Sequence, residues 1–348
     1  MTTPVLVVCP GRGSYDRAGL GQLSHRNDQV EQLLDHCDAW RSARGRPTIR
    51  DLDGADAYRA SRHVAGEHAS LLTFACSLAD LRSLDSSRYE VVGVTGNSMG
   101  WYTALAAAGA LDLDAAIELV DTMGWYQKGH VIGGQVLYPL GGPGELVRPS
   151  VLAAVDDALA RCQAAGHVAE WSIRLGSYAV LGADKAGTKW LLEHLPPVKV
   201  GERTFPAQLP FHSAFHTSLL HETSSRAVHD LAHLRPVAPQ VPLIDGQGTV
   251  WKPGHADPEA MWRYTLTHQV TRPYDFTTAI RTALRYTGAE LVVALGPGNS
   301  LGGPLSRILT HEGWRGLRTS ADLAAAATSG APALLSFGVP AQRERLLP

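Results

Sequence analysis

Short apolar runs alternate with longer segments of helical periodicity along most of the chain. Residues 5–8, 91–94 and 291–295 are mostly β-branched or aliphatic, and each run leads into a turn that contains glycine. Apolar residues recur at helical spacing over several longer segments: 22–40, 65–83, 113–127, 258–267 and 276–286. Strands that alternate with helices are typical of a parallel sheet covered on both faces. The pattern therefore predicts an α/β fold.

The pattern changes in the middle of the chain. Between residues 132 and 200 it predicts short strands and two amphipathic helices, in the order 136–140, 149–165, 168–173, 178–181 and 185–194. This βαββαβ-like alternation indicates a small split-βαβ subdomain inserted into a larger one. We therefore assign residues 1–131 and 201–348 to a large α/β catalytic domain and residues 132–200 to the small subdomain. No structure is predicted for the alanine-rich tail after residue 314.

Composition and charge exclude several classes of function. The chain has 348 residues, 45% of them hydrophobic and 18% charged, as in an ordinary globular protein. A net charge of −2 offers no electrostatic argument for a nucleic acid or an anionic membrane as a partner. The four cysteines lie far apart without metal-ligand spacing, and no signal peptide or membrane-spanning run is present. We expect a cytoplasmic protein with no metal site.

The run at 91–94 leads into Gly-x-Ser-x-Gly, formed by Gly96, Ser98 and Gly100, and an alanine-rich segment of helical character follows. A sharp turn from a strand into a helix needs residues without side chains on both sides of the serine. Such a turn exposes the serine hydroxyl, and the helix N-terminus behind it favours negative charge on a bound oxygen. The sequence therefore predicts a nucleophile elbow, although a glycine-rich turn with an incidental serine would show the same letters.

A serine nucleophile needs a base, and the segment 209–220 contains two histidines, His212 and His216. Their spacing of four could also bind a metal on one helix. However, no carboxylate or third ligand is nearby, and Pro210 argues against a helix. A structural role for either histidine stays open on the residues alone.

Four motifs follow one another in a distinctive order: Pro-Gly-x-Gly-Ser at 10–14, Gly-x-Ser-x-Gly at 96–100, Ala-Phe-His at 214–216 and Gly-Pro-Gly at 296–298. In this order the chain resembles the malonyl-CoA:acyl carrier protein transacylase family, which includes the acyltransferase domains of polyketide synthases. The resemblance runs from residue 10 to about residue 307. It implies a hydrolase-like parallel-sheet core with an inserted ferredoxin-like small subdomain. It also implies substrates linked to pantetheine, as acyl-CoA or acyl carrier protein, and no bound cofactor.

The resemblance implies a role for five residues. Ser98 matches the acyl-accepting serine of the family and His216 its catalytic histidine. Gln269 matches the residue whose backbone carbonyl, in place of a carboxylate, orients that histidine. The amides of Met99 and Arg12 match the oxyanion hole, although the family usually has glutamine at the position of Arg12.

Three departures from the family concern the substrate. Asn97 and Trp101 replace a histidine and an acid beside the serine, and Met123 replaces an arginine that pairs with the free carboxylate of the substrate. Methionine cannot form that pair. We assign these three residues to the substrate pocket and expect acyl groups without a carboxylate to be preferred, with Trp101 adding apolar surface. Another arginine, such as Arg12 or Arg174, would restore malonyl binding if it reached the same place.

Several functions are compatible with these residues. The first is ping-pong transfer of an acyl group between pantetheine thioesters in fatty acid or polyketide biosynthesis, through an acyl-serine. The second is a thioester hydrolase that uses water as acceptor with the same machinery. The third is an ordinary esterase whose base is a distal histidine such as His268 or His311. A fourth, non-enzymatic reading is a protein that only docks carrier proteins, against which an intact Ser98 and His216 argue.

Overall fold

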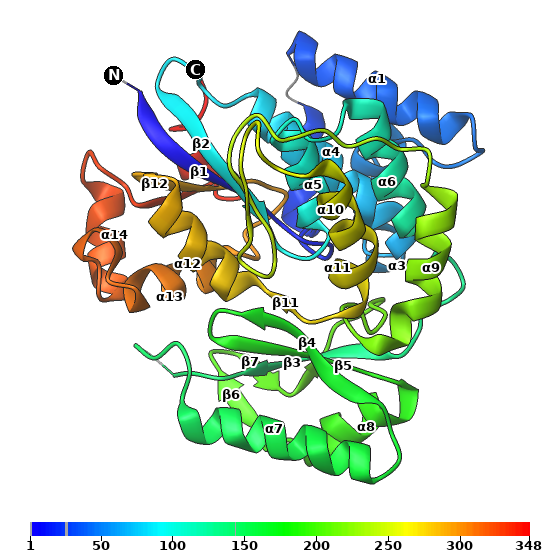
Figure 1. Cartoon of the computed structure of the whole chain (residues 1–348). Coiled ribbons are helices and arrows are strands. Elements are labelled where there is room, and N and C mark those ends of the chain that lie inside the picture. Colours follow the sequence, from blue (N-terminus) through cyan, green and yellow to red (C-terminus); the bar gives the residue numbers. More distant parts are fainter. Residues whose placement is uncertain (1, 25–26, 143) are drawn as a thin grey trace.

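The computed structural model describes residues 2–24, 27–142 and 144–348 (Figure 1). Its larger sheet has the strand order β10-β9-β2-β1-β12-β13, and every neighbouring pair is parallel except β10 with β9. The strands are β1 (Thr3–Cys9), β2 (Tyr89–Gly96), β9 (Leu243–Ile244), β10 (Val250–Trp251), β12 (Leu291–Ala294) and β13 (Leu334–Ser336).

The central strand β1 explains why the sheet must be covered on both faces. Its residues from Val5 to Cys9 are all apolar and have no exposed surface, as in a strand that is buried on both sides. Figure 1 shows α1, α4, α5 and α6 to one side of β1 and β2 and α12 and α13 to the other. These helices are α1 (Asp28–Ser42), α4 (Gly66–Arg82), α5 (Gly100–Ala107), α6 (Leu113–Trp125), α12 (Phe276–Tyr286) and α13 (Gly302–His311). The predicted α/β core is confirmed.

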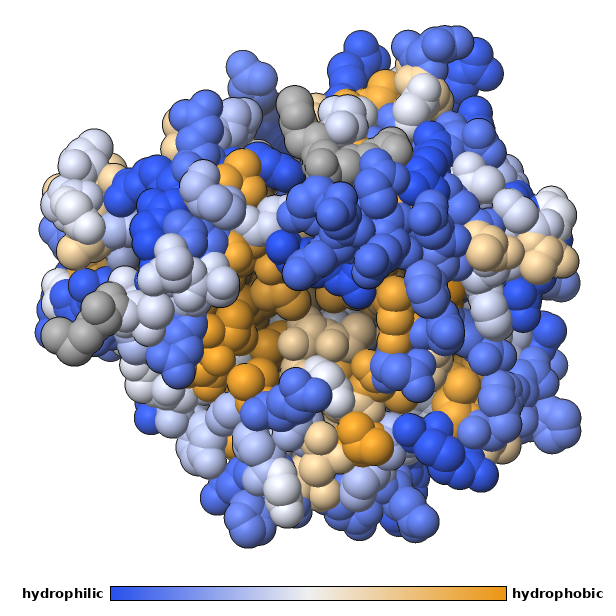
Figure 2. Space-filling view, turned by 90° about the horizontal axis from the view of Figure 1, so that it is seen from above, coloured by the Kyte–Doolittle hydropathy of each residue, from blue (hydrophilic) through white to orange (hydrophobic). Residues whose placement is uncertain are grey.

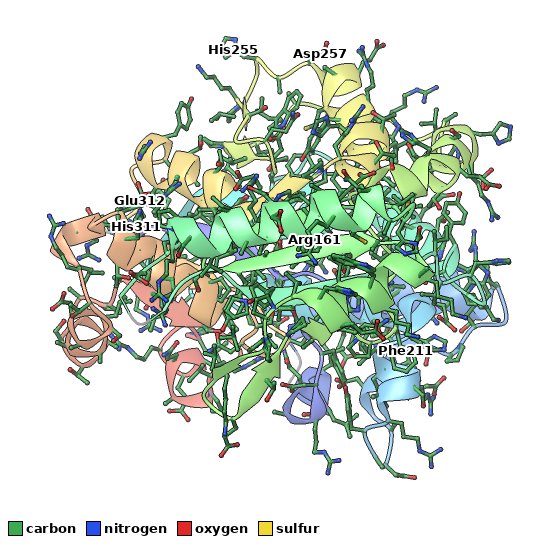
Figure 3. The ribbon with its side chains drawn as sticks, turned by 90° about the horizontal axis from the view of Figure 1, so that it is seen from below. Arg161, Phe211, His255, Asp257, His311 and Glu312 are labelled. Carbon is green, nitrogen blue, oxygen red and sulfur yellow. The ribbon has the colours of Figure 1, made fainter. Side chains whose placement is uncertain are left out.

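The small subdomain has a sheet and a core of its own. Strands β4, β5, β3 and β8 lie in that order and are antiparallel, with α7 and α8 as the two crossovers, which is the ferredoxin-like arrangement. Figures 1 and 3 show α7, which carries Arg161, on the face turned away from the large domain. The elements are β3 (Gly134–Pro139), α7 (Pro149–Ala164), β4 (Ala169–Leu175), β5 (Tyr178–Ala183), α8 (Lys185–His194) and β8 (Ala207–Gln208).

The predicted boundary at residue 200 is too early. The hairpin of β6 (Val198–Val200) and β7 (Arg203–Phe205) follows α8, and only then does β8 pair with β3 and complete the small sheet. A strand of two residues is too short to show a period in the sequence. In addition, β11 (Tyr274–Asp275) of the large domain pairs with β4, so the two sheets are joined at this edge.

The remaining elements complete the large domain. The tail contributes α14 (Ser320–Thr328), the edge strand β13 and α15 (Pro340–Arg343). The other helices are α2 (Ile49–Asp53), α3 (Ala60–His63), α9 (His221–Asp230), α10 (Pro258–Arg263) and α11 (Gln269–Thr271), with a π-helical segment Tyr264–His268 between the last two. Within the described ranges, no helix is both long and apolar enough to cross a membrane.

The direction of the strands places their carboxyl ends next to the small subdomain. Both β1 and β2 begin near the end of the molecule where the two termini lie and run toward the small subdomain (Figure 1). The turns that follow β1 and β2 therefore lie at the end of the strands that faces the small subdomain. On the opposite side, where the termini lie, the surface has a hollow in which apolar side chains gather, surrounded by hydrophilic residues (Figure 2).

Candidate active site

The turn between β2 and α5 has the geometry that the sequence predicts for a nucleophile elbow. Ser98 has a φ of 56°, in the left-handed region that residues with side chains rarely adopt. A Cβ on Gly96 would lie 2.2 Å from the Gly100 carbonyl oxygen, and one on Gly100 would lie 2.2 Å from that of Cys9. Both glycines are therefore required for the serine to hold this strained position.

A hydrogen bond connects the serine to a histidine on another loop. The Oγ of Ser98 lies 2.7 Å from Nε2 of His216, and the other ring nitrogen, Nδ1, lies 2.5 Å from the carbonyl oxygen of Gln269. A carbonyl can only accept, so Nδ1 carries the proton and Nε2 accepts from the serine hydroxyl. In this tautomer His216 is ready to take the serine proton.

Proline explains why a main-chain carbonyl is free to orient the histidine. A helical carbonyl normally accepts from the amide four residues later, but for Gln269 that residue is Pro273, which has no N–H. The Gln269 carbonyl can therefore accept from His216 instead. Among the described residues, no carboxylate is hydrogen-bonded to the His216 ring. The third group of the triad is thus a backbone atom.

The side chain of Gln269 holds the elbow from the other direction. Its Nε2 donates to the Ser98 carbonyl at 3.0 Å, and its Oε1 accepts from the Tyr102 hydroxyl at 2.9 Å. The Tyr274 hydroxyl donates to the carbonyl of Gly96, two residues before the serine, at 2.6 Å. One residue therefore contacts the His216 ring through its backbone and the turn at Ser98 through its side-chain amide. The resemblance implies only the first of these contacts.

Burial keeps the histidine neutral. His216 is 2% exposed, and desolvation lowers its pKa to about 4, with the hydrogen bond to Gln269 opposing this shift and the nearby His268 adding to it. His216 is therefore unprotonated at neutral pH, as a general base must be.

Two backbone amides near the serine are free to bind an anion. Gly11 lies against the elbow, since a Cβ on it would be 2.9 Å from the Asn97 carbonyl oxygen and 3.6 Å from the Cβ of Ser98. Within the described part of the chain, neither the Arg12 amide in this turn nor the Met99 amide after the serine donates to a protein acceptor. Unpaired amides beside a nucleophile are the arrangement that stabilises a tetrahedral oxyanion.

A cavity of about 690 Å³ lies beside Ser98, between the two subdomains. Its wall is mainly apolar and comes from both of them: Val64, Met123, Leu137, Ile173, Val180 and Phe215. Asn97 and Met123, which the sequence assigns to the substrate pocket, both line this cavity. The cavity is large enough for an acyl chain together with part of a pantetheine arm.

Trp101 lies outside this cavity, so the prediction that it adds apolar surface to the pocket is wrong. It is fully buried; its indole N–H donates to Thr265 Oγ1 at 2.9 Å, and its ring meets Tyr264 edge-on at 5.3 Å. The next residue of α5, Tyr102, lines the cavity, so Trp101 points to a different side of the same helix. The tryptophan anchors the elbow helix.

His212 does not contact the serine. Its Nδ1 lies 2.7 Å from the Pro210 carbonyl oxygen and its Nε2 lies 3.3 Å from that of Arg12. Phe211 next to it is 42% exposed and lies at the edge of the molecule in the view of Figure 3. His212 therefore contacts the oxyanion turn and not the nucleophile.

Of the two arginines considered from the sequence, only Arg12 enters the cavity. Its Nη2 donates to the Phe211 carbonyl at 3.3 Å and its guanidinium lies 4.7 Å from the centre of the Phe215 ring. Arg174 is exposed and stacks on Trp171 at 4.2 Å. The resemblance concerns only the backbone amide of Arg12. The sequence therefore does not predict the direction of its side chain.

No group of three or more metal-binding side chains occurs among the residues that the structure describes.

Several solved structures are similar over the whole chain. An acyl-carrier-protein S-malonyltransferase from Burkholderia pseudomallei is 23% identical, with a TM-score of 0.74 and 99% of each chain covered. The malonyl-CoA:acyl carrier protein transacylase FabD from Xanthomonas oryzae is 21% identical, with a TM-score of 0.73, covering 100% of this chain and 98% of the other. A malonyl-transacylase solved with its type II polyketide synthase acyl carrier protein is 18% identical, with a TM-score of 0.73 and 99% of each chain covered.

The chain has the fold of these transacylases. This confirms the predicted fold class, a hydrolase-like parallel-sheet core with a ferredoxin-like insertion. No protein-family model and no curated protein sequence matches the chain.

Proposed function

We propose that the protein is an acyltransferase that moves an acyl group between pantetheine thioesters through an acyl-serine at Ser98. The observation that carries this proposal is the hydrogen-bonded series from the Ser98 hydroxyl through His216 to the Gln269 carbonyl, beside two unpaired amides. This geometry supplies a nucleophile, a base and an oxyanion site within one cavity.

The first half-reaction acylates the serine. His216 Nε2 takes the hydroxyl proton as Ser98 Oγ attacks the thioester carbon, and the amides of Met99 and Arg12 hold the negative oxygen. The carbon–sulfur bond then breaks, and the histidine returns the proton to the leaving thiol. In the second half-reaction another pantetheine thiol gives its proton to His216 and its sulfur attacks the ester carbon. The bond from that carbon to Ser98 Oγ then breaks, and the histidine returns the proton to Oγ.

An acyl carrier protein is the proposed partner on at least one side, with acyl-CoA or acyl carrier protein on the other. The similarity to a malonyl-transacylase that was solved with its acyl carrier protein supports this partner. Fatty acid or polyketide biosynthesis is the corresponding context.

The acyl group depends on two residues with opposite effects. Met123 gives the wall an apolar, adaptable surface, which on its own favours chains without a carboxylate. Arg12 brings a cation into the same cavity. Leaving a charge desolvated and unpaired costs several kcal/mol, which is more than the contact one methionine side chain can return. The cation therefore has the larger effect on which acyl group fits.

Intact-protein mass spectrometry tests the proposed function. The purified protein is incubated with a panel of acyl-CoAs, and then with a holo acyl carrier protein. We expect an acyl mass on the wild type, none on Ser98→Ala, and its transfer to the carrier protein thiol. An acyl-enzyme that discharges to water as fast without the carrier protein as with it identifies a thioester hydrolase instead. No acyl mass with any thioester contradicts the proposal.

A further inference from the structure

The guanidinium of Arg12 occupies a space that a glycine provides. A Cβ on Gly66 would lie 2.5 Å from Arg12 Nη1 and 3.2 Å from Cδ of Gln127, so these three groups meet at one point. Gln127 lies two residues beyond the end of α6, and a Cβ on Gly124, the residue after Met123, would lie 2.8 Å from the Gly66 carbonyl oxygen. Arg12 therefore reaches, from the turn after β1, the part of the wall to which Met123 belongs.

The polar atoms at this point have no partner. Nη1 of Arg12 and Oε1 of Gln127 are both buried and form no hydrogen bond with any described residue, and Gln127 is only 8% exposed. Glu67 is close enough to act on the charge of Arg12 but forms no hydrogen bond or ion pair with it among the described residues. Buried donors and acceptors without partners are rare in proteins, and one explanation is a ligand that supplies the missing hydrogen bonds.

The neighbouring helix adds a further reason to expect an anion. α4 begins at Gly66, and no side chain caps its N-terminus. The N-terminal end of a helix is positive, so a cation beside it is unfavourable and an anion favourable. An arginine, a helix N-terminus and an amide that can turn its NH₂ group inward therefore converge on one place.

We propose that the Arg12 side chain binds a carboxylate carried by the acyl group. The carboxylate would lie in the part of the cavity next to Met123, the position at which the transacylase family has an arginine. This inference rests on the proposed function, because the acyl chain enters the cavity from Ser98. The free Nη1 of Arg12 donates to the carboxylate and Gln127 supplies a second donor. Arg203, the other arginine of the cavity, is exposed on the β7 hairpin and remains solvated.

The alternative occupant is an uncharged acyl chain. Such a chain would exclude water from the guanidinium and leave Nη1 without a hydrogen-bond partner. The charge would then be balanced only by the Phe211 carbonyl, the Phe215 ring and the nearby Glu67. A carboxylate forms a charge-assisted hydrogen bond there, which is stronger than one between neutral groups. The acyl groups that fit best are thus short chains with a terminal carboxylate.

Malonyl-CoA and acetoacetyl-CoA are a matched pair of probes, since their acyl groups have the same number of non-hydrogen atoms and differ in carboxylate against methyl ketone. The rate of acyl-serine formation is measured for each on the wild type, Arg12→Met and Gly66→Ala. We expect the wild type to favour malonyl by at least about tenfold, the size of one charge-assisted hydrogen bond. Arg12→Met should remove this preference. Gly66→Ala, which displaces Nη1 without touching the charge, should reduce it.

Arg174→Met is the control, because this exposed arginine lies outside the cavity and its loss should leave the malonyl-to-acetoacetyl ratio unchanged. A wild type that loads acetoacetyl as fast as malonyl overturns the proposal, as does an Arg12→Met variant that slows both thioesters by the same factor. Failure of every thioester to acylate the wild-type serine instead contradicts the proposed function. Circular dichroism confirms that each variant is folded.

Discussion

The two ends of the cavity differ in how their polar groups are satisfied. At the catalytic end, Ser98, His216 and Gln269 are connected to one another by hydrogen bonds. At the acyl end, Arg12 and Gln127 each bury a polar atom that has no partner within the described residues. The nucleophile and its base are thus already connected in the free protein, although the amides of Met99 and Arg12 beside them are unpaired. On our proposal, the free polar atoms of Arg12 and Gln127 are paired only when a substrate brings a carboxylate.

This difference follows from what each end must do. Chemistry at the serine requires a fixed geometry before substrate arrives, because groups that are already oriented need no reorganisation in the transition state. Recognition requires polar groups whose bonds form only when the right ligand is present. A wrong ligand then leaves them unpaired at a cost of about 1–3 kcal/mol each.

The largest effect is expected at the nucleophile. Ser98→Ala should abolish acyl-enzyme formation, because no other hydroxyl occupies the elbow. The measurement is the intact mass after incubation with acyl-CoA, with circular dichroism to show that the fold is retained. An acyl mass on the folded alanine variant would show that another residue is the acceptor.

The two histidines of the loop provide the next comparison. His216→Ala should slow acylation by about 10²- to 10⁴-fold, since the serine loses its proton acceptor. His212→Ala should cost much less, because the hydrogen bonds of this ring to described residues go to the Pro210 and Arg12 carbonyl oxygens and not to Ser98. Single-turnover acylation rates for both variants measure the difference. Equal losses in the two folded variants would contradict the assignment of His216 as the base.

The side chain of Gln269 should have an intermediate effect. Gln269→Ala retains the backbone carbonyl for His216 but loses the bonds to Ser98 and Tyr102, so we expect kcat to fall by about tenfold with KM little changed. The variant Gln269→Glu keeps an acceptor for Tyr102 but places a buried carboxylate oxygen against the Ser98 carbonyl oxygen. It should therefore lower kcat at least as much as alanine does. A Gln269→Ala variant with full kcat would show that the amide is not needed to hold the elbow.

The pH dependence reports the burial of the base. Because the pKa of His216 is lowered to about 4, kcat/KM for acylation should stay level from pH 7 to about pH 5 and fall only near pH 4. The same shift in pKa affects the free energy of unfolding. Between about pH 6.5 and pH 4 the histidine binds a proton in the unfolded chain but not in the folded one. Stability is therefore expected to decline as the pH falls from about 6.5 toward 4. A kinetic midpoint near 6.5 in folded protein would show that the base is solvated.

Most regular elements of the fold can be predicted from the sequence, and the exceptions share a cause. The helices at Lys185–His194 and Phe276–Tyr286 agree with their predicted bounds, because each has an amphipathic period and an aspartate that caps its first turn. The strands β8 and β13 have two or three residues, and only their pairing with distant strands makes them regular. Such pairing leaves no local pattern.

At the site, the sequence predicts residues that a motif determines and misses those that depend on the direction of a side chain. The resemblance to the transacylase family implies the pairing of Ser98, His216 and the Gln269 carbonyl, and the three are connected by hydrogen bonds in the structure. The position of the Arg12 guanidinium depends on the turn between Gly11 and Gly13, where Gly13 has a φ of 92°. The inward course of Trp101 depends in turn on the packing around α5. Neither direction can be derived from the residue types.

The smallest effect, and the one that separates the two explanations of substrate choice, is expected at Met123. If an uncharged wall at this position decides the acyl group, Met123→Arg should shift the malonyl-to-acetoacetyl ratio toward malonyl by tenfold or more. If Arg12 already binds the carboxylate, a second arginine adds little and repels the first, so the ratio should change by less than about threefold. Met123→Leu, which keeps volume and charge, controls for packing. A shift of tenfold with Met123→Arg and none with Met123→Leu would show that the carboxylate has no partner in the wild type and that Arg12 serves only through its backbone amide.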